Sequence, residues 1–149
     1  MKRPHREKIA MKASPFFVPI AIVLLLWNLM GVAAFIMQFT MDYAELAKTD
    51  PYTARMMTTM PGWLWGVYAV AVGAGTLGAG TLLARRAAAA ALFALSLVAV
   101  IIQFGHALAL TDLIAVKGWS AAAFPAFIVL MAAIQYGYAR ALVAKGALR

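Results

Sequence analysis

The chain of 149 residues contains no cysteine. Without thiols it forms no disulfide, offers no thiolate to a metal ion and carries no thiol redox chemistry. Histidine is scarce as well, because His5 lies in a basic leading segment and His106 alone lies in an apolar run. Haem would need a methionine or a second subunit to complete its ligands. We therefore predict that the chain holds no metal and no cofactor.

Carboxylates are missing from every long apolar run of the sequence. The acidic residues are Glu7, Asp42, Glu45, Asp50 and Asp112. A small exporter driven by protons or cations needs a carboxylate inside the membrane, and an aspartyl intramembrane protease needs two. A serine protease is excluded too, because Ser96 and His106 are roughly 15 Å apart along one helix. The sequence thus indicates that the protein is not an enzyme.

Apolar residues dominate the composition: 65% of the residues are hydrophobic and the mean hydropathy is +0.87. A soluble domain of this length cannot bury so much apolar surface. Four runs are long enough to cross a hydrocarbon layer of about 30 Å as helices of about 20 residues. These runs span 16–39, 62–84, 87–110 and 121–144. The sequence therefore predicts an all-α membrane protein, an antiparallel bundle of four transmembrane helices.

Basic residues are distributed unevenly between the two sides of this bundle. Ten of the thirteen Lys and Arg residues lie in the leading segment 1–15, in the link between the second and third runs, and from Arg140 through 145–149. Positive charge marks the cytoplasmic side. We therefore predict a multi-pass protein of the bacterial inner membrane with both termini in the cytoplasm. The charges form no single patch, so we expect the lipid bilayer, and no nucleic acid, as partner.

The loop 40–61 on the opposite side is long enough for a helix that lies on the membrane surface. Met56, Met57 and Met60 have helical spacing. Two interpretations remain open for them: the methionines rest on lipid, or the loop is a plain tether.

The second apolar run is rich in glycine and alanine. Gly73, Gly75 and Gly78 belong to overlapping pairs of small residues four positions apart. Such pairs allow the backbone of a neighbouring helix to come close. We predict that these glycines mediate helix packing, inside the bundle or between subunits, and the alternative is that they form a flexible wall beside a substrate or water.

A few polar side chains are placed within the apolar runs, where an unpartnered amide costs several kcal/mol. The candidates are Asn28, Gln38, Gln103, His106 and Gln135. Gln103 and His106 share one helix face, and we expect both to point into the bundle and to meet Gln38. These residues line a ligand pocket or, alternatively, form hydrogen bonds that only fix the packing.

The segments Trp27-Asn28-Leu29-Met30-Gly31-Val32 and Met60-Pro61-Gly62-Trp63, with Gln38 between them, precede the glycine-rich run. In these motifs the chain resembles a family of small four-helix bacterial inner-membrane proteins often labelled as sugar transporters. The resemblance covers most of residues 16–110 and implies a transporter.

Two functions are compatible with these observations. The first is a structural or accessory membrane protein that assembles as a homo-oligomer and has no chemistry of its own. The second is a binding protein or carrier for a small solute such as a sugar, with its pocket among the polar residues named above. A cavity lined by those residues favours the second, and a dry, fully packed bundle favours the first.

Overall fold

A computed structural model describes residues 14–149. The four long helices are α2 (Phe17–Phe39), α5 (Gly62–Leu83), α6 (Ala88–Ala109) and α8 (Ala123–Ala144). The short ones are η1 (Ser14–Phe16), α3 (Tyr43–Leu46), α4 (Pro51–Thr59), α7 (Leu113–Lys117) and η2 (Trp119–Ala122). No strand occurs among the described residues. The predicted all-α fold of four long helices is confirmed, while nearly all of the tail predicted for residues 1–15 lies outside the described part.

The ends of the elements follow from local sequence. Asp50 caps α4, because its carboxylate accepts a hydrogen bond from the backbone N–H of Thr53, and Pro51 occupies the first helical position. At the other end of the chain, α8 ends at Ala144, and the backbone turns away two residues later at Gly146. The φ of Gly146 is 72°, the left-handed conformation that glycine adopts without strain. All four long helices begin and end close to the predicted positions.

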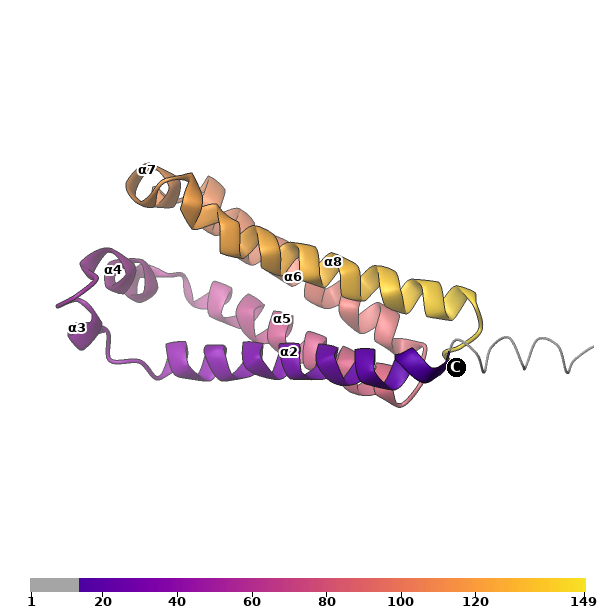
Figure 1. Cartoon of the computed structure of the whole chain (residues 1–149). Coiled ribbons are helices and arrows are strands. Elements are labelled where there is room, and N and C mark those ends of the chain that lie inside the picture. Colours follow the sequence, from indigo (N-terminus) through magenta and orange to yellow (C-terminus); the bar gives the residue numbers. More distant parts are fainter. Residues whose placement is uncertain (1–13) are drawn as a thin grey trace, which may run out of the picture.

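The long helices pack as a row in the order α2, α5, α6, α8. The two edge helices of the row meet at mid-length, where Trp27 of α2 packs edge-on against Phe127 of α8 with ring centroids 5.5 Å apart. In Figure 1, α2 and α8 converge toward the end that holds both described chain ends and diverge toward α4 and α7. We call these the terminal end and the α4/α7 end. In this row α5 lies between α2 and α6.

The main hydrophobic core fills the terminal half of the bundle. It joins all four long helices through Phe17, Ala21, Leu24, Ala79, Leu82, Ala89, Ala90, Phe93, Ala139 and Leu148. Gly78 is essential to this packing, because a Cβ atom there would lie 2.9 Å from the ring of Phe93, which is itself buried. Alanine and glycine on α5 and α6 thus let the two backbones come close.

The last residues fold back against the link between α5 and α6. The backbone N–H of Arg149 donates to the carbonyl oxygen of Arg85 at 2.9 Å, and the N–H of Ala87 donates to the carbonyl of Arg149 at 2.7 Å. These two bonds place the side chain of Leu148 in the core. Residues 145–149, predicted as the cytoplasmic end of the chain, are therefore part of the packed structure.

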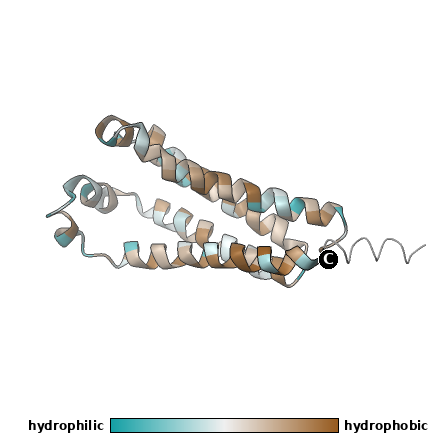
Figure 2. Ribbon diagram, viewed as in Figure 1, coloured by the Kyte–Doolittle hydropathy of each residue, from teal (hydrophilic) through white to brown (hydrophobic). Residues whose placement is uncertain are grey.

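The outward faces of the long helices are covered with large apolar side chains, such as Val23, Leu77, Val98 and Leu130. Figure 2 shows mainly hydrophobic colours along these helices, paler and more hydrophilic colours on α4, and both kinds on α3. Each of the four helices is long and apolar enough to cross a bilayer. The chain is therefore a multi-pass membrane protein whose outward surface is solvated by lipid.

Candidate functional site

The half of the bundle toward α4 and α7 is hollow. A cavity of about 790 Å³ lies between the four long helices. It extends from the middle of the bundle to the loops of the α4/α7 end, and α4 contributes to its lining. The cavity exists because α2 and α8 diverge there (Figure 1). Its volume is in the range of sites for small molecules.

The floor of the cavity is a polar layer at mid-length of the bundle. The side-chain nitrogen of Asn28 on α2 donates to the side-chain oxygen of Gln135 on α8 at 2.6 Å and to the carbonyl of Leu24 at 2.7 Å. Both amides are buried, with 7% and 4% of their surfaces exposed. The Asn28–Gln135 bond links the two edge helices of the row, so these residues close the ring of helices below the cavity.

Gly75 of α5 makes room for this layer. A Cβ atom at position 75 would overlap the side-chain oxygen of Asn28 and would lie 3.1 Å from the hydroxyl of Ser96. The Ser96 hydroxyl in turn donates to the backbone carbonyl of Ala71 at 2.7 Å. Polar groups from α2, α6 and α8 therefore gather around one glycine of α5, and together with the backbone they form the cavity floor.

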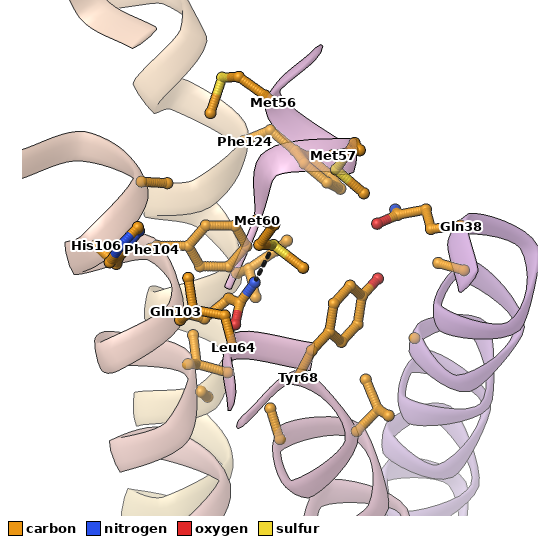
Figure 3. A pocket seen from close by; sticks show the side chains of 18 of the residues that line it. Gln38, Met56, Met57, Met60, Leu64, Tyr68, Gln103, Phe104, His106 and Phe124 are labelled. Carbon is orange, nitrogen blue, oxygen red and sulfur yellow. Dashed lines mark hydrogen bonds between the residues drawn. The ribbon is translucent and has the colours of Figure 1, made fainter. Parts of the chain in front are cut away.

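One amide on the cavity wall is only half satisfied. Gln103 of α6 donates its side-chain nitrogen to the sulfur of Met60 at 3.7 Å, a weak acceptor. Its side-chain oxygen is buried and has no hydrogen-bond partner among the described residues. Figure 3 shows this amide between Met60 and Leu64, beside the phenol of Tyr68. A buried oxygen without a donor is costly, so a ligand that donates a hydrogen bond here is stabilised.

The five polar residues singled out in the sequence, Asn28, Gln38, Gln103, His106 and Gln135, all line this one cavity. The contact expected between Gln38 and the pair Gln103 and His106 is wrong, however. Gln38 lies on the opposite wall from Gln103 (Figure 3), and His106 packs edge-on against Trp63 with ring centroids 5.7 Å apart. The physical reason is the interposed helix α5, which separates α2 from α6.

The loop between α2 and α5 forms the lid of the cavity. Met56 and Met57 of α4, and Met60 directly after it, line the cavity, and Figure 3 shows the three side chains gathered on one side of it. The helix expected in this loop is present as α4, so the interpretation of the loop as a plain tether is wrong. The methionines, however, line the cavity, whereas the sequence suggested that they rest on lipid. Flexible thioether side chains adapt to ligands of different shape.

Three polar contacts join the two loops at the α4/α7 end, and we call them the latch. The hydroxyl of Tyr52 donates to the carboxylate of Asp112 at 2.7 Å. The guanidinium of Arg55 lies 3.9 Å from the same carboxylate. The ammonium of Lys117 lies 3.4 Å from the carboxylate of Asp50. The latch thus ties α4 to the segment that contains α7 across the mouth of the cavity.

Two groups of the latch have shifted pKa values. Hydrogen bonds from the hydroxyl and the backbone N–H of Thr53, with a smaller contribution from Lys117, lower the pKa of Asp50. Desolvation and the hydrogen bond to Asp112 raise the pKa of Tyr52. Asp50 is therefore ionised and Tyr52 protonated at neutral pH, which are the forms that the contacts require.

The three glycines predicted to pack differ in their surroundings. Gly75 and Gly78 lie against neighbouring side chains, but a Cβ atom at Gly73 would meet nothing within 4 Å. The prediction for Gly73 is therefore wrong within this chain, because Gly73 lies two residues, about 200° of helix rotation, from Gly75. Spacing of small residues alone did not distinguish these faces.

No three His, Asp or Glu side chains among residues 14–149 lie close enough to hold a metal ion. The chain matches no protein-family model, no curated protein and no solved structure. Membership of the family of small inner-membrane proteins remains a prediction.

Proposed function

We propose that this protein binds a small, neutral and mainly apolar molecule in the cavity between its four long helices. The observation that carries the proposal is a mainly apolar cavity with a few polar side chains on its wall, among them Gln103, whose buried side-chain oxygen has no hydrogen-bond donor among the described residues. A hydroxyl or amide group of a ligand supplies that donor once the Gln103 side chain turns its oxygen toward the cavity. Convergent polar groups within an apolar pocket are the usual composition of a small-molecule site.

The lining favours an apolar ligand over a sugar. Four methionines, Met30, Met56, Met57 and Met60, and several aromatic rings line the cavity. Among the described residues that line it, the charged ones are Arg55 and Asp112 at the mouth, and these lie 3.9 Å apart as an ion pair. A sugar needs many hydrogen-bonding groups around it, whereas a neutral amphipathic molecule needs few. The sugar implied by the resemblance is therefore the less suitable ligand.

A purely structural or accessory role, with or without homo-oligomer formation, accounts less well for this interior. Packing alone favours filled space, because empty volume forfeits dispersion contacts. The interior of the terminal half is occupied by the main core, whereas the interior of the other half holds polar groups around about 790 Å³ of space. We also propose, from the charge distribution, that the protein resides in the bacterial inner membrane with the cavity mouth facing outward and both termini in the cytoplasm.

The proposal is tested by native mass spectrometry of protein purified in mild detergent from its own membranes. We expect the parent protein to carry a bound small molecule. Ala34→Phe fills the cavity, because Ala34 lines it, and should reduce the bound fraction about tenfold, equivalent to roughly 1.4 kcal/mol. Gln103→Leu should also weaken binding, because it removes the hydrogen-bond acceptor.

The matched control is Ala33→Phe, which adds the same ring to the neighbouring residue. Ala33 is exposed on α2 and does not line the cavity, so its variant should retain the bound molecule. Parent protein without any bound molecule, or Ala34→Phe with unchanged occupancy, would show that the cavity is not the binding site.

A further inference from the structure

A second groove lies between α6 and α8, at the terminal end. Its volume is about 560 Å³. Ala87, Ala90, Ala91 and Ala94 line it from the start of α6, and Tyr136, Arg140, Val143 and Ala144 line it from α8. The short alanine side chains leave space between the two helices there. From Ala87 to Ala94 the groove runs about 10 Å along α6 into the apolar layer.

Arg140 is the one charged side chain that residues 14–149 contribute to the lining of this groove. It lies about one turn before the end of α8, and its guanidinium is 5.9 Å from the centre of the Tyr136 ring. No carboxylate pairs with Arg140 among the described residues. An arginine at this depth reaches the headgroup region of a bilayer.

The whole terminal end is positively charged. Arg85, Arg86, Arg140, Lys145 and Arg149 lie there, and the Asp and Glu residues within 14–149 all lie in the loops at the α4/α7 end. The three salt bridges of the described residues are likewise at the α4/α7 end. The surroundings of the groove therefore attract an anion.

We propose that this groove binds one anionic phospholipid, with an acyl chain along the alanines of α6 and the phosphate on Arg140. The groove leads from the headgroup region into the hydrocarbon layer and is mainly apolar, which suits an acyl chain. At its edge lies Arg140, which pairs with no carboxylate of residues 14–149 and suits the phosphate. Basic pockets between transmembrane helices bind anionic headgroups in this way. The site is separate from the cavity and does not depend on the ligand proposed there.

A second copy of the chain is a less suitable occupant of the groove. In a two-fold symmetric dimer centred on this groove, each groove faces its own counterpart. The Arg140 side chains would then approach each other at an end that already carries only basic side chains among the described residues. Repulsion between like charges opposes this contact, whereas the phosphate of a lipid neutralises the positive charge of Arg140.

The test is a titration of delipidated full-length protein in neutral detergent, with bound lipid counted by native mass spectrometry. The probes are phosphatidylglycerol and phosphatidylcholine with identical acyl chains. We expect the parent to bind phosphatidylglycerol more tightly than phosphatidylcholine. Arg140→Gln should weaken that affinity about fivefold, and Arg140→Lys should largely retain it. Ala91→Leu should weaken binding of both lipids, because it places a larger side chain in the groove at an exposed position.

The matched control is Arg85→Gln, which removes the same charge from the same end. Arg85 lies over the ring of Phe17, at 4.7 Å, on the α2 side of the bundle, so its variant should bind phosphatidylglycerol like the parent. If Arg85→Gln and Arg140→Gln lost equal affinity for phosphatidylglycerol, the proposal would be overturned. Such a result would indicate that the positive charge of the terminal end attracts the lipid without a specific site. The proposal would also be overturned if Ala91→Leu bound both lipids like the parent while matching its thermal stability. A third contrary result is that Ala91→Leu dissociates a dimer of the protein but keeps its bound lipid.

Discussion

Asn28 and Gly75 depend on each other at mid-length of the bundle. The amide of Asn28 occupies the space that a Cβ atom of residue 75 would fill, and its hydrogen bond to Gln135 fixes its position. Neither residue can be understood alone. A polar side chain within the membrane requires a partner, and the bulk of that side chain requires a glycine on the adjacent helix.

The first prediction is that Gly75→Ala destabilises the protein by about 1–3 kcal/mol, because the added methyl group displaces the Asn28 amide. Thermal unfolding in detergent measures this change. Asn28→Ala removes the obstructing group, so the double variant Asn28→Ala/Gly75→Ala should lose less stability than the sum of the two single variants.

Gly73→Ala is the control for this prediction, since the same substitution on the same helix meets nothing within 4 Å. It should be neutral or should stabilise the protein by up to about 1 kcal/mol through helix propensity. Equal destabilisation by Gly73→Ala and Gly75→Ala, or strict additivity with Asn28→Ala, would contradict the proposed steric conflict.

At the scale of elements, α4 is held over the cavity by side chains of another loop. Tyr52 and Arg55 project from α4 toward Asp112, which precedes α7. The two loops are 60 residues apart at the Tyr52–Asp112 bond. Exposed contacts of this kind are individually weak, so the latch is able to open without unfolding the bundle.

The second prediction is that Tyr52→Phe makes the cavity more accessible. The absence of native cysteine allows a single Met57→Cys reporter on the lid to be labelled with a membrane-impermeant maleimide. Loss of the Tyr52–Asp112 bond should raise the labelling rate about 1.4- to fivefold, as expected for a contact of about 0.2–1 kcal/mol. Lys48→Gln is the control, because the Lys48–Glu45 pair lies within one loop and should leave the rate unchanged.

The same reporter measures the pH dependence of the latch. The pKa of Asp50 is lowered from 3.8, so its contribution is present above the unfolded value and is lost as the pH falls through the folded value. Labelling of the Met57→Cys reporter should therefore be constant near neutral pH. It should increase only at strongly acidic pH, measured as the ratio to an exposed cysteine at position 48. A rise at pH 6–7 would mean that another group controls the lid.

The third prediction concerns the final segment, which the chain uses as a structural element. Leu148→Ala should destabilise the protein by about 2–5 kcal/mol, because it removes a side chain that is only 6% exposed in the main core. Thermal unfolding in detergent is again the measurement. Leu130→Ala, at a position that is 54% exposed, is the control and should change the stability little; equal effects would place Leu148 outside the core.

At the scale of the whole molecule, the two halves of the bundle serve different purposes. The terminal half contains the main core and five basic residues, Arg85, Arg86, Arg140, Lys145 and Arg149. The other half contains the cavity and the loops that cover it. A rigid half thus supports a half with room to accommodate a ligand.

The fourth prediction is the orientation of this molecule in the membrane. Single cysteines at Lys48 and Ser120, both exposed at the α4/α7 end, should react with impermeant maleimide added to intact cells. A cysteine at Lys145 should react only after the cells are opened, because positive charge keeps the terminal end in the cytoplasm. Labelling of position 145 in intact cells would show that the orientation in the membrane is the opposite of the one proposed.

The sequence was sufficient to predict the four long helices and to find the polar residues of the cavity. Long apolar runs reveal helices directly, and the scarcity of amides in those runs made Asn28, Gln103 and Gln135 conspicuous. It was not sufficient to predict their partners. Gln103 was assigned to Gln38 and instead contacts Met60, because nothing local in the sequence states which helix lies between two others.

The number of membrane spans, their limits and the separation of charge were thus determined by the sequence alone, since each depends on residues that are close together in the chain. Tertiary structure decided the order α2, α5, α6, α8, the hollow half and the role of the methionines as a lid. The bond between Asn28 and Gln135 joins residues 107 positions apart. Such a contact depends on how all four helices pack at once, and hydrophobic patterns along one helix carry no information about it.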